Sequence, residues 1–222
     1  MTSIPQSRSE TRREERCGQF LRKARRLFLA RGYEATTIED VSHLAGFSKR
    51  TVYLYFETKH ELFCAVLQPE LSELRDRLEH VVLPDDDGRA QLIAVAHEYV
   101  AFTQERPDVF SLLMHFETHD FYRGRDVARL RQHATACLAI NEQISERVDS
   151  TIQRGLDDGS IESEQTPAQL NLMFWASAVG ILQVCRQRAT VLESHYGITE
   201  SDLIDAFIHR MFSVRPNQGV SQ

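Results

Sequence analysis

The sequence predicts an all-α protein of about nine helices. Apolar residues recur with the 3.6-residue period of an amphipathic helix in almost every long segment. No segment shows the alternation of apolar and polar residues that is typical of a half-buried strand. Threonine and serine residues that can cap a helix stand directly before several of these segments. With 42% hydrophobic and 26% charged residues, the composition is that of a folded globular protein.

Four helices are expected in the first part of the chain. Their approximate ranges are 9–30, 37–45, 48–55 and 58–82. Thr37 with Asp40, and Thr58 with Glu61, have the spacing of a capping box, in which two side chains satisfy N–H groups at the helix start. Gly46 separates the second helix from the third, since glycine adopts the left-handed conformation that a tight turn requires. The two helices on either side of Gly46 are therefore expected to be short.

Five further helices are expected in the rest of the chain. Their approximate ranges are 89–104, 108–117, 126–157, 166–190 and 199–212. Pro107 forces a break, because proline has no N–H and disfavours a helical residue before it. Thr166, Pro167 and Gln169 combine an N-cap, a proline at the first helical position and a capping-box glutamine, the strongest helix start in the chain. We expect a loop at 118–125.

The net charge of −6 conceals an asymmetry between the two ends of the chain. Residues 1–64 hold 12 Lys and Arg against 8 Asp and Glu, while residues 65–222 hold 14 against 24. This distribution predicts that a polyanion binds the N-terminal segment. We therefore expect a basic N-terminal domain at 1–64 that meets the polyanion, a second domain at 65–213, and a flexible tail at 214–222.

Cysteine usage and hydropathy indicate a cytoplasmic protein. The four cysteines are scattered without a CxxC pair or a metal-finger spacing, which favours reduced thiols. The polar N-terminus contains no apolar run of the kind found in a signal peptide. No stretch approaches the roughly 20 apolar residues of a membrane span. We therefore expect a soluble protein without a membrane partner.

The helices at 37–45 and 48–55 have the dimensions of a helix-turn-helix. The apolar residues expected to face inward, with Phe47 between the two helices, are Ile38, Val41, Leu44, Ala45, Val52 and Phe56. The outer face combines cationic, hydroxyl and aromatic side chains, which suit phosphates and the edges of bases. The predicted DNA contacts are Thr37, Ser48, Lys49, Arg50, Thr51, Tyr53, Tyr55 and Lys59.

Residues 36–67, TTIEDVSHLAGFSKRTVYLYFETKHELFCAVL, resemble the DNA-binding signature of the TetR family of bacterial transcriptional regulators. The matching pattern is T-x-x-x-[IV]-A-x-x-A-G-[VF]-S-x-x-[TL]-[VL]-Y-x-[YH]-F-x-[SN]-K-x-x-L. Ser42 stands where the family usually has alanine, and Thr58 replaces the usual serine or asparagine cap. The resemblance implies a DNA-binding domain at 1–64 with a major-groove recognition helix at 48–55, and a ligand-binding and dimerisation domain at 65–213. It also implies a homodimer and repression of a palindromic operator that a small molecule relieves. The rest of the chain resembles the family only in helical plan.

Aromatic side chains gather in the helices of the second domain, and most are expected to form its core. As in the pockets of the TetR family, some are expected to line a cavity: Tyr99, Phe102, Phe116, Met173 and Trp175. This set predicts an apolar or aromatic ligand, and polar groups at the rim suggest one polar end. We expect no cofactor.

Three histidines leave a metal-dependent function open. His115 and His119 are spaced i, i+4, and with His97 they could bind zinc or nickel. No HExxH motif supports them, and the sequence contains no nucleophile elbow, Walker loop or dinucleotide fingerprint. We therefore expect no enzyme activity. The alternatives to a regulator are a metal-dependent helical hydrolase and a helix-turn-helix module that binds proteins, although neither requires cationic and tyrosine side chains on one exposed face.

The last two predicted helices have an apolar excess. The helix at 199–212 ends the fold and has little left to cover, yet it is rich in large apolar residues. The helix before it adds further apolar residues together with small ones that allow close approach. We therefore predict a two-fold homodimer with a four-helix interface. The predicted interface residues are Leu172, Ala176, Leu182, Leu203, Phe207 and Met211.

Overall fold

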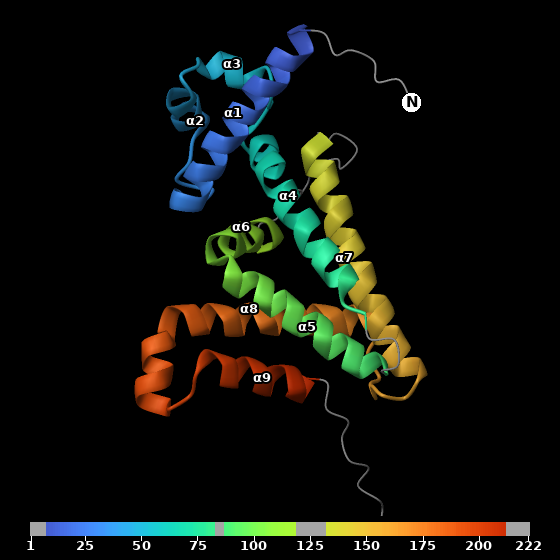
Figure 1. The fold of residues 1–222 in the computed structure, drawn as a ribbon. Coiled ribbons are helices and arrows are strands. Elements are labelled where there is room, and N and C mark those ends of the chain that lie inside the picture. Colours follow the sequence, from blue (N-terminus) through green and yellow to red (C-terminus); the bar gives the residue numbers. More distant parts are fainter. Residues whose placement is uncertain (1–7, 83–86, 119–131, 212–222) are drawn as a thin grey trace, which may run out of the picture. The chain divides into compact units, whose positions relative to one another are not determined.

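The computed structural model describes residues 8–82, 87–118 and 132–211, and all regular structure in these ranges is helical, as predicted (Figure 1). The elements are α1 (Arg8–Arg31), α2 (Ile38–Ala45), α3 (Lys49–Tyr53), α4 (Lys59–His80), α5 (Gly88–Glu105), α6 (Pro107–Thr118), α7 (Gln132–Asp157), α8 (Pro167–Val191), the π-helical turn η2 (Leu192–Tyr196) and α9 (Glu200–Met211). The expected tail at 214–222, most of the expected loop at 118–125 and the expected start of α7 at 126 lie outside the described residues.

Two helix boundaries differ from the sequence-based expectation. The helix α3 ends at Tyr53, because Tyr55 donates its backbone N–H to Val52 O at 3.0 Å in a tighter turn. The helix α6 begins at Pro107 itself, since proline is tolerated at the first helical position, where its missing N–H has no partner in any case. The earlier end of α3 leaves one predicted functional residue, Tyr55, just beyond the helix. The other predicted functional residues that the structure describes stay in their expected elements.

Two of the predicted capping boxes are complete, and the box predicted for Thr58 with Glu61 forms only its Thr58 arm. Both arms of the capping box are present at Thr37 with Asp40 and at Thr166 with Gln169. Thr58 also caps its helix, accepting the backbone N–H of Glu61 at 3.0 Å. The Glu61 carboxylate makes a longer-range contact that the sequence did not reveal, since it accepts the N–H groups of two residues in the first turn of α7. This carboxylate therefore joins α4 to α7.

Two compact units divide the chain by packing. Unit 1 comprises residues 1–73 and 105–141, and unit 2 comprises residues 74–104 and 142–222. The division falls inside α4 and α7 and near the end of α5. This grouping differs from the functional domains expected at 1–64 and 65–213, which stay a prediction.

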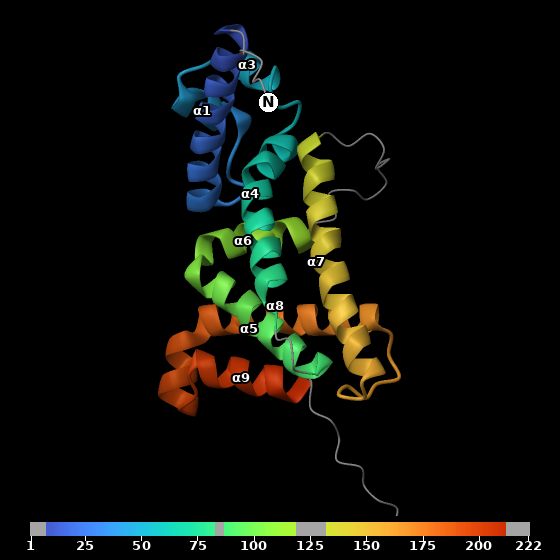
Figure 2. The same ribbon diagram turned by 45° about the vertical axis from the view of Figure 1, so that its right-hand side comes forward.

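Unit 1 is built around an aromatic core. In both views α3 lies beside α1 (Figures 1 and 2). The fully buried rings of Phe20, Phe28, Phe56 and Phe63 lie between the helices. Phe28 and Phe63 meet edge to face, with ring centroids 5.3 Å apart. On α1 the apolar residues Phe20, Ala24, Leu27 and Phe28 form a buried stripe, and Leu21 beside them is half-buried.

Unit 2 pairs α8 with α9, which lie side by side in both views (Figures 1 and 2). Phe174 stacks on Phe207 with ring centroids 5.4 Å apart. Elsewhere in this unit the start of α5 meets the end of α7 so closely that a Cβ atom on Gly88 would lie 2.2 Å from the backbone N of Gly155. The Asp158 carboxylate accepts the N–H of Gly88 at 2.7 Å and closes this junction.

One helical segment is long and apolar. The residues from Pro167 to Tyr196 reach a mean hydropathy of 1.4 in their most apolar stretch, and only 28% of that stretch is buried. By length and composition alone the segment could cross a membrane, but a single helix of this kind is weak grounds for a membrane protein. Its exposed apolar residues still require an explanation.

Candidate nucleic-acid interface

The turn between α2 and α3 has the geometry that a helix-turn-helix requires. Gly46 ends α2 in the left-handed region with φ of 74°. The hydroxyl of Ser48 accepts the backbone N–H of Thr51 at 3.2 Å and so caps α3. This cap places Lys49 and Arg50 in the first turn of α3, where both side chains are exposed.

The inner face of the motif packs largely as predicted. Val41 and Val52 are fully buried, and Phe56 is 1% exposed. The ring of Phe47 meets Phe20 edge to face at 5.2 Å. Leu44 corrects the prediction, since 37% of it is exposed, because α1 and α3 cover the other side of this short helix.

The exposed face carries the cationic and aromatic groups that the sequence placed there. Tyr53 is 45% exposed, and Lys49 Nζ lies 3.9 Å from the Glu39 carboxylate in a surface ion pair that contributes little to stability. Thr51 is half-buried, with its hydroxyl 2.8 Å from that of Ser48. The sequence reasoning missed Leu54, which is 72% exposed directly beside this face. Its position between two tyrosines at the end of α3 was the available signal.

Three other predicted DNA contacts have structural partners inside unit 1. Lys59 Nζ donates to Tyr33 O at 3.0 Å and lies 4.0 Å from the centroid of the same tyrosine ring. Tyr55 is half-buried and meets Phe20 edge to face at 5.3 Å. The Thr37 hydroxyl donates to the Asp40 carboxylate at 2.7 Å. These residues shape the motif, and their contact with DNA stays a prediction.

The capping carboxylate of α2 has a perturbed ionisation. Hydrogen bonds from the Thr37 hydroxyl and then from the Thr37 backbone N–H hold the pKa of Asp40 below its ordinary value. The carboxylate is solvent-exposed and stays ionised at neutral pH. It occupies the N-terminus of α2, where a DNA phosphate would otherwise find free N–H groups.

The predicted ligand residues are placed differently from one another. Phe102 is fully buried in unit 2, where the Arg77 guanidinium lies 5.4 Å from its ring centroid. Phe116 is buried in unit 1, and Tyr99 and Trp175 are half-buried in unit 2. Met173 is 51% exposed, so it does not line an enclosed cavity of its own unit. This corrects the prediction, because Met173 lies about 100° around the helix axis from the buried Phe174, on the exposed side of α8.

The three candidate metal-binding histidines have separate surroundings. His97 lies 3.8 Å from the Asp205 carboxylate, and the ring of His115 lies against the ring of Tyr33 with centroids 4.5 Å apart and a tilt of 30°. His119 lies outside the described residues. Within residues 8–82, 87–118 and 132–211, no group of three or more His, Cys, Asp or Glu is arranged to hold a metal ion.

The predicted interface residues divide between an exposed face and the core. Leu172 is 63% exposed and Ala176 is also exposed. Leu182 is only 1% exposed and belongs to the core of unit 2, which corrects its assignment to the interface. Leu203 and Phe207 are half-buried, and the side chain of Met211 lies outside the described residues. The expectation that α9 has little to cover was wrong, because its Ile204 and Ile208 are buried in unit 2.

Comparison with known proteins relates the helix-turn-helix segment to a family of regulators. Residues 20–66, which include the whole helix-turn-helix, match the family model described as bacterial regulatory proteins, tetR family. This segment of the chain belongs to the TetR family. This membership makes the chain a transcriptional regulator and not the metal-dependent hydrolase considered as an alternative.

Individual relatives extend the similarity beyond the motif. The transcriptional activator FasR of Mycolicibacterium smegmatis is 30% identical over 125 residues, and the match spans 56% of each chain. The transcriptional repressor DhaR of a Mycobacterium species is 25% identical over 172 residues, which are 76% of this chain and 83% of DhaR. The structure of FadR from Bacillus subtilis, in complex with stearoyl-CoA, has a TM-score of 0.63 at 13% identity and covers 88% of this TetR-family chain and 97% of FadR. This last likeness shows a shared fold.

Proposed function

We propose that this TetR-family regulator is a repressor that binds a two-fold symmetric operator as a homodimer and is released by a small apolar molecule. The main observation in favour of DNA binding is the exposed face of α3, which contains Lys49, Arg50 and Tyr53 and follows the N-cap Ser48. A face of this composition has no role in packing unit 1. It suits a surface that is anionic and regularly spaced, as the major groove of DNA is.

The roles of the three side chains follow from their chemistry. Arg50 can donate two hydrogen bonds to the O6 and N7 atoms of one guanine, which is the commonest specific contact in the major groove. Lys49 is a point charge suited to a phosphate, and the Tyr53 hydroxyl can donate to a phosphate oxygen. Arg50 is therefore assigned to sequence recognition, and the other two are assigned to affinity.

A single experiment tests the DNA-binding part. Fluorescence anisotropy with the duplex that flanks the protein's own gene should show saturable binding, and random duplex of equal length should bind far more weakly. The affinity should fall steeply as salt rises, because each neutralised phosphate releases counterions. Equal affinity for both duplexes would contradict an operator-specific regulator.

The dimer proposal rests on the exposed apolar face of α8. This face, here called the α8 face, consists of Leu172, Met173, Ala176, Gly180, Val184 and Val191. The positions from Leu172 to Val184 fall within about 120° around the helix axis and form one stripe, while Val191 follows a break in the helix at Arg188. The two small residues lie near its centre and would let a second helix approach closely. A second copy presents the same stripe, which makes a symmetric interface self-complementary.

The ligand proposal rests on aromatic residues of α5, α6 and α8. Phe102 and Phe116 are buried, and Trp175, the single tryptophan of the chain, is half-buried. The ligand must bind the DNA-free form more tightly than the DNA-bound form, and by linkage the operator must weaken ligand binding by the same factor. We expect the proposed repressor to switch by a change in the spacing of its two recognition helices.

Trp175 fluorescence provides the measurement. Native mass spectrometry of the purified protein should reveal a copurified small molecule, and its removal should shift the tryptophan emission. Trp175→Ala should abolish the response of operator binding to that molecule while operator affinity is retained. If the substitution removes dimerisation and operator binding together, Trp175 belongs to the structural core and the ligand assignment is wrong.

A further inference from the structure

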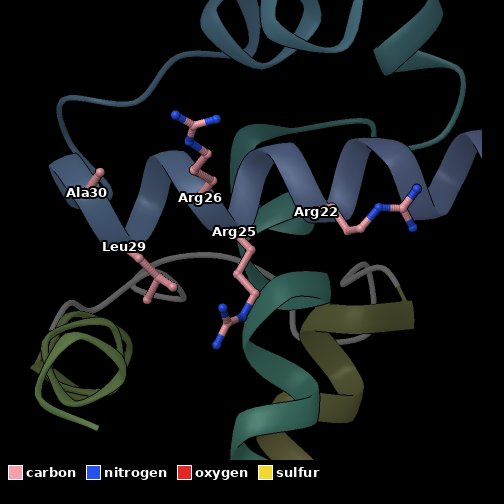
Figure 3. A pocket seen from close by; sticks show the side chains of 5 residues that line it. All are labelled: Arg22, Arg25, Arg26, Leu29 and Ala30. Atoms are coloured by element: carbon pink, nitrogen blue, oxygen red, sulfur yellow. The ribbon is translucent and has the colours of Figure 1, made fainter.

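A hollow of about 470 Å³ lies on α1, on the side away from the buried stripe of that helix. Its lining residues are Arg22, Arg25, Arg26, Leu29 and Ala30 (Figure 3). Figure 3 shows Arg25 and Arg26 extending to opposite sides of α1, with Arg22 extending along the helix. Three arginines and an apolar patch line the hollow, and their guanidinium groups point in different directions.

Only one of these arginines is neutralised by a carboxylate in unit 1. Arg25 donates from Nε and NH2 to the Glu70 carboxylate at 3.0 and 2.9 Å. The other oxygen of Glu70 accepts from Arg106, which also pairs with Glu73. Two carboxylates and two guanidinium groups thus form a closed network that holds Arg25 at the edge of the hollow.

The two remaining arginines carry uncompensated charge. In the part of the chain that the structure describes, neither Arg22 nor Arg26 has a carboxylate within ion-pair distance. The stretch from Arg16 to Arg31 contains six Lys and Arg and no acidic residue. Like charges spaced i, i+4 on a helix repel one another, so helix stability does not explain this pair. The hollow therefore has an excess of two positive charges without a structural use.

Operator DNA is not the natural occupant of this hollow. The turn and end of the recognition helix pack on α1 through contacts with Arg13, Arg16 and Phe20. The hollow begins beyond these residues, in the C-terminal half of α1, beside the ion-pair network of α4. Its charges are therefore available to a different anion.

We propose that this hollow binds a small phosphorylated organic molecule. The Cβ atoms of Arg22 and Arg26 are expected about 6 Å apart, so rotation of the two side chains from the directions seen in Figure 3 can bring both guanidinium groups to the same phosphate. Guanidinium groups bind phosphate oxygens in pairs of parallel hydrogen bonds, and a phosphate monoester with two negative charges matches the two uncompensated arginines. Leu29 and Ala30 provide an apolar wall for the organic part. The site lies in unit 1 and shares no residue with the aromatic set assigned to the effector.

The test uses 4-nitrophenyl phosphate as the probe, with isothermal titration calorimetry on the full-length protein. The wild type should bind the probe at pH 8 and bind 4-nitrophenol, which lacks the phosphate, at least about tenfold more weakly. Arg22→Gln with Arg26→Gln should lose the phosphate-dependent affinity. The matched control Arg12→Gln with Arg31→Gln removes the same charge from exposed positions of α1 outside the hollow and should keep it. Glutamine preserves helix propensity, so circular dichroism should show all variants folded.

Three results would overturn the proposal. In the first, the wild type does not bind the probe at all, and in the second, both double variants lose the same affinity. In the third, Arg22→Gln with Arg26→Gln binds the probe as tightly as the wild type does. Operator binding provides a fourth criterion. If Arg22→Gln with Arg26→Gln weakens operator affinity and makes its salt dependence shallower, the hollow contacts DNA phosphates and is not a small-molecule site.

Discussion

The helices α3 and α8 both expose residues that their own units do not cover, but the exposed faces are chemically opposite. α3 presents Lys49, Arg50 and Tyr53, which are well hydrated and need no partner to remain stable in water. α8 presents Leu172 and Val184 at 63% and 44% exposure, which costs free energy until another apolar surface covers them. The first face indicates reversible binding of a polyanion. The second indicates a permanent protein contact.

The largest expected effect comes from charging the α8 face. Leu172→Glu with Val184→Glu should convert the proposed dimer into a monomer, because four carboxylates cannot be buried in a symmetric apolar interface. Operator affinity should then fall by about 100- to 10,000-fold, since each half-site must be bound separately. Sedimentation velocity and fluorescence anisotropy measure the two effects. Ala139→Glu with Ser150→Glu, at exposed positions of α7, is the charge-matched control and should remain dimeric.

A smaller and more specific loss is expected on α3. Arg50→Ala should cost about 1–3 kcal/mol of operator binding and relax the preference for one base pair, because the bidentate contact with guanine is lost. Competition assays with operators altered at single positions measure this preference. Arg188→Ala, which removes an exposed arginine from α8, should leave it unchanged. Equal losses on operator and random duplex would assign Arg50 to the phosphates.

Two further α3 substitutions separate charge from hydrogen bonding. Lys49→Gln should weaken binding to all duplexes and lower the slope of log affinity against log salt by about 0.9, since one phosphate contact no longer releases a counterion. Tyr53→Phe should also weaken all duplexes, by about 1 kcal/mol, but should leave the slope unchanged because the lost donor is neutral. A salt titration of both variants shows the difference. Identical slopes for Lys49→Gln and the wild type would contradict the phosphate role of Lys49.

The smallest effect concerns the caps of α2 and α8, which have the same geometry but different chemistry. The box at α2 uses Asp40, whose pKa is lowered by its bonds with Thr37, whereas the box at α8 uses Gln169, which does not titrate. Because the folded-state pKa of Asp40 is below its unfolded value, its stabilisation is present above the ordinary carboxyl range. It is lost as the pH falls through the lowered folded-state pKa. The α2 cap should therefore weaken in acid while the α8 cap does not.

Amide hydrogen exchange of α2 and α8 between neutral pH and the acid range, corrected for the intrinsic exchange rate, measures this difference. Asp40→Asn should remove the acid-dependent part of the protection at α2. Gln169→Glu should introduce an acid dependence at α8, where the wild type has none from this box. If the protection of α2 and α8 in the wild type depends on pH in the same way, groups other than Asp40 control the acid dependence.

Interactions between residues a few positions apart could be predicted from the sequence. The Thr37, Thr166 and Thr199 caps and the Gly46 turn depend on groups within about one helical turn, so the local sequence contains all of their partners. The helix-turn-helix and its exposed Lys49 and Arg50 follow from these local elements. The family signature in the same stretch then indicated DNA binding.

The choice among chemically similar side chains was decided by tertiary packing. Leu172 and Leu182 are both leucines on α8, but one is 63% exposed and the other 1%, because α9 and its neighbours cover only one side of that helix. The carboxylate of Glu61 binds the start of α7, and Arg25 binds Glu70, which lies 45 residues away. A sequence read in windows of one or two turns contains no information about such partners. The sequence alone therefore determined the helices, their caps and the DNA-facing surface, while the covered faces and the ion-pair network depend on which distant segments the fold brings together.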